Sequence, residues 1–347
     1  MIDIRPRGIG SLLEKYLEYN KISQSDFANM LGISQKHMNE IINGKTKIST
    51  ELMLGISLLT DIDVNLIAFA EQRKEMYDYL NTNIGNHKEI NEFLNSYHIK
   101  EMIKNNWIKV RDIDDQSTSA IDLLNFLKVK NFDIESNYID NRILYKKLDN
   151  ANNRKILLWL RRCDNLCNGV EVPKYESSKL KDLFKELEIE RTKEFNKDSL
   201  IELFKKYGII LVIENPLKGT KIRGCSMVKV KTPAIYMTTY FKTLDSFYFT
   251  LYHELGHIKS DYNKLISKIE VEDTDEEKED NFALDKMIPN DIWNEIISYN
   301  KIDEELINNI CENNNIPKCF VYGRLAKLNY ISFSSELYSK YKKTIEL

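Results

Sequence analysis

Glycine and proline are scarce in this chain, and that scarcity limits the folds open to it more than any other feature. The 347 residues include 12 Gly and 6 Pro, about 3.5% and 1.7% against usual levels of about 7% and 5%. A sandwich or barrel of many short strands needs the frequent turns that these residues form. Since 42% of the residues are apolar, burial can offset the entropy lost on folding. The sequence therefore predicts a mainly helical protein with a small β-sheet, in the α+β class.

Several classes of protein are excluded by what the sequence lacks. No apolar run reaches the 18 or so residues that a membrane helix needs, and the first residues lack the apolar core of a secretory signal. The five cysteines include no C-x-x-C pair, so neither a disulfide framework nor a thiolate zinc finger is indicated. A formal charge of −3 excludes a globally basic nucleic-acid coat. We expect a soluble, cytoplasmic protein without a membrane partner.

Changes in sequence texture divide the chain into four segments. Residues 1–75 contain short helical patterns separated by turn signals, and residues 76–170 continue as helical pieces without a chemical motif. Residues 171–295 bring β-rich runs between two helical stretches, and residues 296–347 return to short helices. We expect a small helical bundle, a helical connector, a mixed α+β domain and a C-terminal helical extension.

Two short helices joined by a glycine turn are predicted within residues 23–49. Ser23 suits the N-cap of the first helix, and Gly32 ends it because glycine accepts the positive φ of a tight turn. Ser34 then caps the second helix, whose outward side chains can reach base edges if the helix enters a major groove. Two lysines in the next turn would lie near phosphates. The candidate DNA-contacting residues are Gln24, Ser34, Gln35, Lys36, His37, Asn39, Lys45 and Lys47.

The charge of this region counts against DNA binding. Residues 1–75 contain nine Lys and Arg against ten Asp and Glu, although residues 34–48 carry three Lys and one Glu. Because affinity for DNA depends largely on neutralising phosphates, a plain helical bundle is the alternative interpretation.

The segment SQSDFANMLGISQKHMNEIINGKTKIS, residues 23–49, resembles the helix-turn-helix domain of Xre/HigA-type phage repressors and antitoxins. It has the order of that family: a helix, a glycine turn, a recognition helix and Asn-Gly. The resemblance implies binding to a double-stranded DNA operator. By analogy it also implies a homodimer, because such domains usually read two half-sites.

The second motif with a chemical meaning is His-Glu-Leu-Gly-His at residues 253–257. On a helix His253 and His257 lie one turn apart on the same face, so both imidazoles can bind one metal ion. Glu254 projects about 100° away, where it can take a proton from water at the metal. Asp261 is a further turn along and could accept an N–H from a ligating histidine. The motif predicts one Zn²⁺ per protomer; two structural histidines on a helix are the alternative.

A third protein ligand is needed, and the acidic segment 273–280 is the expected source. If this segment is helical, Glu276 and Asp280 share a face. Glu276 could then bind the metal while Asp280 accepts the N–H of a ligating histidine. Glu277 and Glu279 compete with Glu276 for the ligand role, and most acidic runs are simply solvated surface.

The region around the histidines resembles the ImmA/IrrE family of zinc metallopeptidases. The resemblance rests on FKTLDSFYFTLYHELGHIKSD at 241–261 and DEEKEDNFALDKMIP at 275–289, with further likeness at 215–228 and 313–332. It implies a zincin-like metallopeptidase domain over 171–295 with a narrow substrate, such as a repressor or the chain itself.

One departure from the family pattern concerns the third ligand. Members commonly have Glu-Ala-Asp or Glu-Ala-Asn before the Phe-Ala pair, whereas this chain has Lys278-Glu279-Asp280-Asn281. If the family ligand lies four residues before the Phe, Lys278 occupies its position. If it lies six before, Glu276 is present.

The combined prediction is a DNA-binding transcriptional regulator with a built-in zinc endopeptidase that cleaves a specific protein. The alternative is a DNA-binding repressor or antitoxin whose peptidase-like domain is an inactive sensor or dimerisation module. In a third interpretation the helix-turn-helix of a peptidase binds a protein partner instead of DNA.

Overall fold

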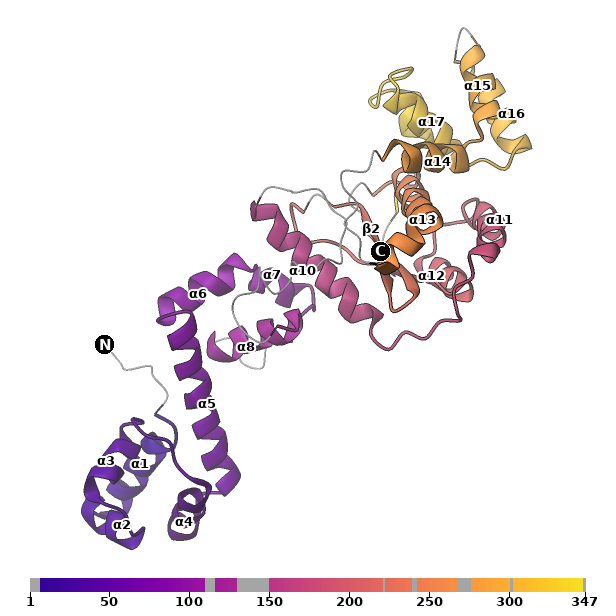
Figure 1. Ribbon diagram of the computed structural model, residues 1–347. Helices are drawn as coiled ribbons and strands as arrows, with labels where there is room; N and C mark the ends of the chain where they lie inside the picture. The colour runs from indigo at the N-terminus through magenta and orange to yellow at the C-terminus, as the bar shows by residue number, and fades with distance from the viewer. Residues whose placement is uncertain are drawn as a thin grey trace. The chain divides into compact units, whose positions relative to one another are not determined.

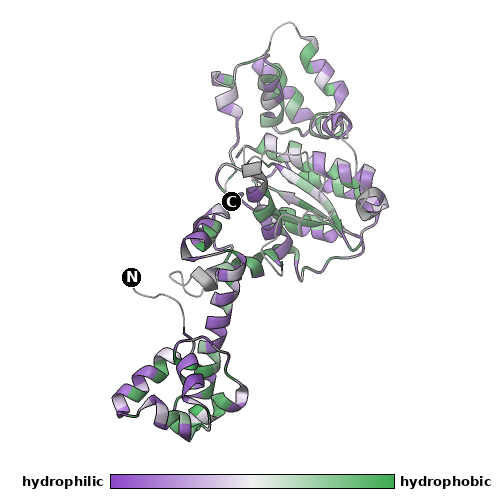
Figure 2. Ribbon diagram, turned by 60° about the vertical axis from the view of Figure 1, so that its left-hand side comes forward, coloured by the Kyte–Doolittle hydropathy of each residue, from purple (hydrophilic) through white to green (hydrophobic). Residues whose placement is uncertain are grey.

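The computed structural model of the chain describes residues 7–109, 116–129, 150–220, 222–238, 242–267, 276–299 and 302–345. The chain divides into two compact units, residues 1–132 and 133–347. The fold is mainly helical with one small sheet, so the predicted α+β class is confirmed (Figure 1). Helices of both units carry hydrophobic residues along one side and hydrophilic residues along the other (Figure 2). None of the helices in the described ranges is long and apolar enough to cross a membrane.

The first unit is helical throughout its described residues. Its helices are α1 (Gly10–Asn20), α2 (Gln24–Met30), α3 (Gln35–Ile42), α4 (Thr50–Thr60), α5 (Val64–Asn83), α6 (His87–Ser96), α7 (Ile99–Lys104) and α8 (Gln116–Leu127).

Serine caps and a glycine turn set the helices of the N-terminal bundle. The side chains of Ser23, Ser34 and Ser49 each accept the backbone N–H three residues ahead, as N-caps do. Gly32 joins α2 to α3 with a φ of 70°, a conformation that glycine adopts without steric cost. The apolar faces meet in one core, made of Ile9, Leu13, Leu17, Phe27, Ala28, Met38, Ile41, Ile42, Ile48, Ile56 and Ile67.

Helix α5 runs without a break through residue 75, where the sequence suggested a domain boundary. Its first part packs on α4, and it also contacts α6 and α8. The N-terminal bundle and the helices after it therefore share one long helix within the first unit.

A buried carboxylate on α5 holds the start of α1. The backbone N–H of Ile9 donates to Oε1 of Glu71 at 2.8 Å, and the preceding Gly8 has a φ of 61°. A Cβ at Gly8 would collide with the Glu71 carboxylate. Burial raises the pKa of Glu71 above its ordinary value, while the Ile9 hydrogen bond and the nearby Lys74 lower it.

We expect Glu71→Gln to make the N-terminal bundle more stable at neutral pH. Because the folded state raises the pKa of Glu71, it holds the proton more tightly than the unfolded state, and stability is lost as pH rises from about 4.5. The loss is at most about tenfold in the folding equilibrium per pH unit, the limit for one proton. Gln still accepts from Ile9 but does not titrate. Hydrogen exchange of the α1 amides, compared between variants at each pH, measures the difference.

Glu18→Gln is the matched control, because Glu18 is exposed on α1 and is not among the groups that shift the pKa of Glu71. An identical pH dependence in wild type and Glu71→Gln would contradict the assignment.

The second unit combines a three-stranded sheet with helices. Its elements are α10 (Asn150–Cys167), the 3₁₀ turn η1 (Ser177–Lys179), α11 (Leu180–Glu190), α12 (Lys197–Lys206), β1 (Ile210–Ile213), β2 (Gly224–Lys229), β3 (Thr232–Met237), α13 (Leu244–Ser267), α14 (Glu277–Met287), α15 (Asn290–Ser298), α16 (Glu304–Asn313), α17 (Lys318–Lys327) and α18 (Glu336–Tyr341).

The sheet lies between α10 and α13. Strand β3 is central, parallel to β1 and antiparallel to β2. Tyr236 of β3 donates to Asp164 of α10 at 2.7 Å, so this side of the sheet faces α10. Cys225 stands opposite Tyr236 in the register. Because side chains alternate along a strand, the next residue, Ser226, faces α13.

Helix α14 packs along α13 and is held at its C-terminal end by Arg191. The buried guanidinium donates to the carbonyl oxygens of Lys286 and Met287, at 2.6 and 3.2 Å. These contacts fix the helix that carries the acidic residues expected at the metal site.

Candidate functional site

Two histidines of α13 turn toward one point. His253 and His257 lie one turn apart, and their Nε2 atoms are 3.2 Å apart. Both rings are largely buried, with 13% and 17% of their side chains exposed.

The other nitrogen of each ring faces a carboxylate. Nδ1 of His253 lies 2.8 Å from Oδ1 of Asp280 on α14, and Nδ1 of His257 lies 3.5 Å from Oδ2 of Asp261 on its own helix. A carboxylate accepts hydrogen bonds, so these contacts favour the tautomer with the proton on Nδ1. The lone pairs on the two Nε2 atoms are then directed at one another.

Glu254 lies between the histidine face of α13 and strand β2. Its Oε2 accepts a hydrogen bond of 2.6 Å from Ser226, whose hydroxyl is also 2.9 Å from the backbone oxygen of Glu254. Gly224 leaves room beside Oε1, where an added Cβ would come within 2.9 Å. Burial raises the pKa of Glu254 to about 7, and the negative charge of Glu276 adds to the rise, while His257 and the Ser226 hydrogen bond lower it.

The acidic segment approaches the histidines from α14. Glu276 is exposed and immediately precedes the helix, with its carbonyl oxygen accepting the N–H of Asp280 at 2.8 Å. Within the described residues, the group of side chains that could hold a metal ion is His257, Asp261 and Glu279, and Glu276 is not part of it. Glu277 is exposed, and Lys278 is exposed beside it. Residues 273–275 lie outside the described residues.

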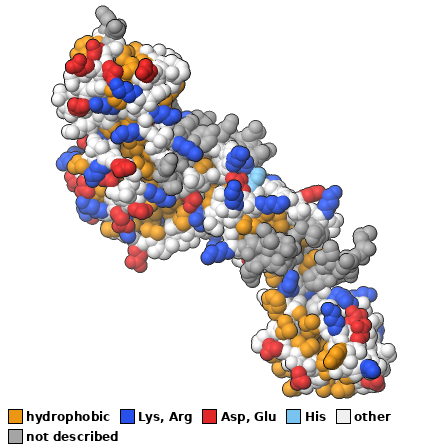
Figure 3. Space-filling view, turned by 180° about the vertical axis from the view of Figure 1, so that it is seen from behind, with side chains coloured by type: hydrophobic (Ala, Val, Ile, Leu, Met, Phe, Trp, Pro, Cys, Tyr) orange, Lys and Arg blue, Asp and Glu red, His pale blue; other side chains and the backbone are white. Residues whose placement is uncertain are grey.

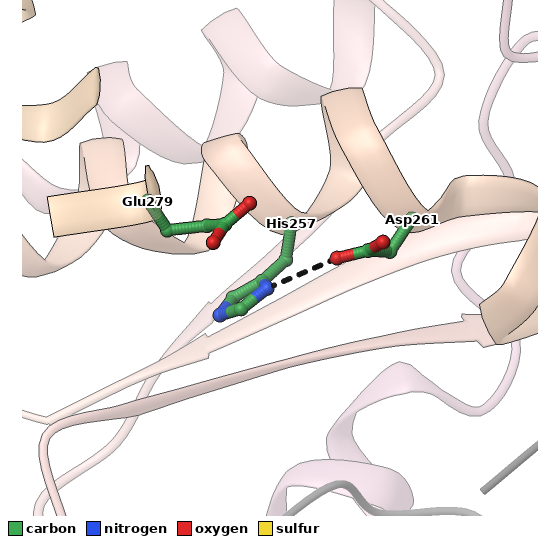
Figure 4. Close-up of side chains that lie close together, drawn as sticks. All are labelled: His257, Asp261 and Glu279. Carbon is green, nitrogen blue, oxygen red and sulfur yellow. Dashed lines mark hydrogen bonds and ion pairs between the residues drawn. The ribbon is translucent and has the colours of Figure 1, made fainter. Parts of the chain in front are cut away.

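Glu279 is directed differently from its neighbours. It is buried, with 5% of its surface exposed, and it accepts a hydrogen bond of 2.8 Å from Ser260. His257, Asp261 and Glu279 each offer an atom within 4.8 Å of those of the others (Figure 4). Asp280 and Asp261, the residues expected to accept hydrogen bonds from the histidines, thus lie beside His253 and His257 respectively. Glu279, which was expected only as a competitor for the ligand role, also lies near His257.

The two imidazoles fit a tetrahedral metal ion. Zinc binds imidazole nitrogen at about 2.0–2.1 Å, so two such ligands in a tetrahedral site lie about 3.4 Å apart. The Nε2 atoms of His253 and His257 are separated by 3.2 Å. Each ring also has the carboxylate contact on its outer nitrogen that metal-binding histidines usually make.

Ser226 and Ser260 were not expected at this site. Ser260 lies three residues after His257 on the same helix, so helical spacing could have indicated it. Ser226 comes from a strand, and its contact with Glu254 depends on the packing of β2 against α13, for which the sequence contains no local signal.

In the first unit, α3 presents a polar face. Gln35, Lys36 and Asn39 are exposed, and His37 is half-buried. The hydroxyl oxygen of Ser34 accepts the backbone N–H of His37 as the N-cap of the helix. Gln24 is the first residue of α2 and is half-buried. Asn39 also accepts a hydrogen bond of 2.8 Å from Asn43.

The two lysines after α3 differ in their surroundings. Both are exposed, but Lys47 forms an ion pair of 3.0 Å with Glu75 of α5. Lys47 would have to exchange this carboxylate for a phosphate in order to contact DNA.

Residues 13–67 match the family model described as Helix-turn-helix. The match spans α2, the Gly32 turn and α3, so the expected helix-turn-helix domain is confirmed. The presence of this domain supports the prediction that the chain is a DNA-binding transcription regulator. No curated protein and no solved structure matches the chain significantly.

Proposed function

We propose that this regulator carries a zinc-dependent endopeptidase in its second unit. The observation that carries the proposal is the pair of Nε2 atoms 3.2 Å apart on His253 and His257, each ring with its Nδ1 toward a carboxylate. Two facing lone pairs repel at this distance, whereas a cation between them makes the arrangement favourable. The H-E-x-x-H sequence and the buried Glu254 support a catalytic centre.

His253, His257 and Glu276 would hold the zinc. When bound, zinc lowers the pKa of water and polarises the peptide carbonyl. Glu254 would take the proton of the attacking water and pass it to the leaving amine. Ser226 holds Oε2 through its 2.6 Å hydrogen bond and so orients the carboxylate.

The proposed substrate is one specific protein, either a repressor- or antitoxin-like partner or the chain itself. The proposed DNA partner is an operator in double-stranded form, bound through α3. A regulator that cleaves one protein bound near its own operator would need only a peptidase of narrow substrate specificity.

A homodimer is part of this proposal. Exposed hydrophobic side chains lie on the N-terminal bundle (Figure 3), and α4 contributes two of them, Leu54 and Leu58, which are 50% and 82% exposed. An apolar face of this kind suits a symmetric contact between two copies, and two copies would read two half-sites.

The zinc content of the purified full chain tests the proposal, with about one zinc per chain as the expected result. Glu276→Ala should weaken zinc binding most among the acidic residues, because it removes a ligand. Asp280→Asn should give an intermediate loss of about 10–100-fold, which is typical when a partner of a ligating histidine is lost. Competition with a chelator measures each affinity.

The exposed Glu277 supplies the matched control, and Glu277→Ala should leave zinc affinity unchanged. Equal losses for all the acidic variants would mean that the segment acts only as a diffuse negative field. A chain that remains metal-free with zinc supplied at neutral pH would favour the alternative, a DNA-binding repressor or antitoxin with an inactive sensor or dimerisation domain.

A further inference from the structure

The hydroxyl of Ser260 has three acceptors around it and one proton to donate. Its Oγ lies 2.8 Å from Oε1 of Glu279, 3.0 Å from the backbone oxygen of Gly256 and 3.2 Å from Oδ2 of Asp261. Hydrogen bonds to a carboxylate are stronger than those to a neutral carbonyl. Glu279 is both charged and nearest, so Ser260 donates to Glu279.

This choice matters for Asp261, whose Oδ2 faces both Ser260 and His257. The separation between that oxygen and Nδ1 of His257 is 3.5 Å, at the long limit for a hydrogen bond. The equivalent contact of His253 with Asp280 is 2.8 Å. The imidazole ring of His257 is therefore held in its orientation less firmly than the ring of His253.

We propose that Glu279 is a positioning residue for the metal centre. By taking the Ser260 proton, it keeps Oδ2 of Asp261 from sharing its acceptor capacity between two donors. The long contact of that oxygen with Nδ1 of His257 is then not weakened further, and Nε2 of the ring stays directed at the metal. The imidazole of His257 and the carboxylates of Asp261 and Glu279 lie close together (Figure 4), each with an atom within 4.8 Å of those of the others. The inference rests on the proposed zinc site and adds to it a residue outside the proposed ligand set of His253, His257 and Glu276.

Glu279 also packs against α13, so a purely structural role must be separated from the positioning role. A Cβ on Gly256 would lie 3.2 Å from Cγ of Glu279. Loss of this packing would lower zinc affinity by the same factor whether or not residue 260 carries a hydroxyl. Losing the acceptor matters only while the Ser260 hydroxyl is present to compete for Asp261.

The test is a double-mutant cycle in the full chain, with the affinity for Zn²⁺ as the readout. Glu279→Ala should lower zinc affinity about tenfold, at the low end for a lost partner of a ligand. In the Ser260→Ala background the same substitution should lower zinc affinity clearly less, because only the negative charge is lost and no hydroxyl shares Asp261. Glu279→Gln, which keeps the side-chain volume, should give a smaller loss that also shrinks in that background.

Glu277→Ala is the control on the same turn of α14, and His253→Ala establishes that the measured zinc occupies this site. Unchanged affinity in Glu279→Ala, or an equal loss in both backgrounds, would overturn the positioning role and leave the zinc site standing. A wild-type chain that binds no zinc would overturn the proposed function and this inference together.

Discussion

Replacing Glu254 with Gln is expected to leave one zinc per chain while lowering peptide cleavage about 10²–10⁴-fold, the usual contribution of a general base. The amide has nearly the same volume and can still accept from Ser226, so the local packing is kept. It cannot take a proton from water. His253→Ala should instead abolish both stoichiometric zinc and cleavage, because it removes a ligand.

The measurements are metal content and the appearance of fragments of the chain, or of added repressor proteins, by mass spectrometry. Glu277→Ala serves again as the control with full zinc and full cleavage. Wild-type rates in Glu254→Gln would remove Glu254 from the mechanism. A wild type that binds zinc but leaves every tested protein intact would make the second unit a sensor.

On its preferred DNA sequence, the regulator should lose about 1–3 kcal/mol of binding free energy when Gln35 or Asn39 is replaced by Ala. Both side chains are exposed on α3, where they can reach base edges. Binding to random DNA should change little. Lys45→Ala should weaken binding to both DNAs nearly equally and reduce the slope of log affinity against log salt by about one.

Lys47→Ala should have a smaller effect than Lys45→Ala, because Lys47 is paired with Glu75 and must leave that partner to reach a phosphate. Titrations of the full chain against DNA fragments across a salt series measure these differences. Glu51→Gln, an exposed change at the start of α4, is a control for nonspecific charge effects. If no fragment is preferred over random DNA, the helix-turn-helix docks a protein instead.

The N-terminal helices could be predicted closely because their signals are local. Ser23 and Ser34 accept the N–H groups expected of N-caps, and Gly32 has the positive φ expected at the turn. Each of these features depends on residues within one turn of the helix. The mainly helical class could be predicted from composition, because a fold of many strands needs more glycine and proline for its turns than this chain has.

The surroundings of the histidines could be predicted only in part. Helical spacing placed Asp261 near His257, and it related Glu276 to Asp280. It could not indicate that α14 turns Glu279 toward Ser260, because that depends on which face of α14 meets α13. The contact between Ser226 and Glu254 depends in the same way on the packing of a strand against a helix distant in sequence.

The unbroken course of α5 decides where this protein can be cut. A fragment ending at residue 75 would stop within that helix, before Leu80, which is fully buried. It would also remove the contacts that α5 makes with α6 and α8. The smallest piece that keeps each described helix of the first unit whole ends after Leu127, so an expression fragment should extend to about residue 132, where that compact unit ends.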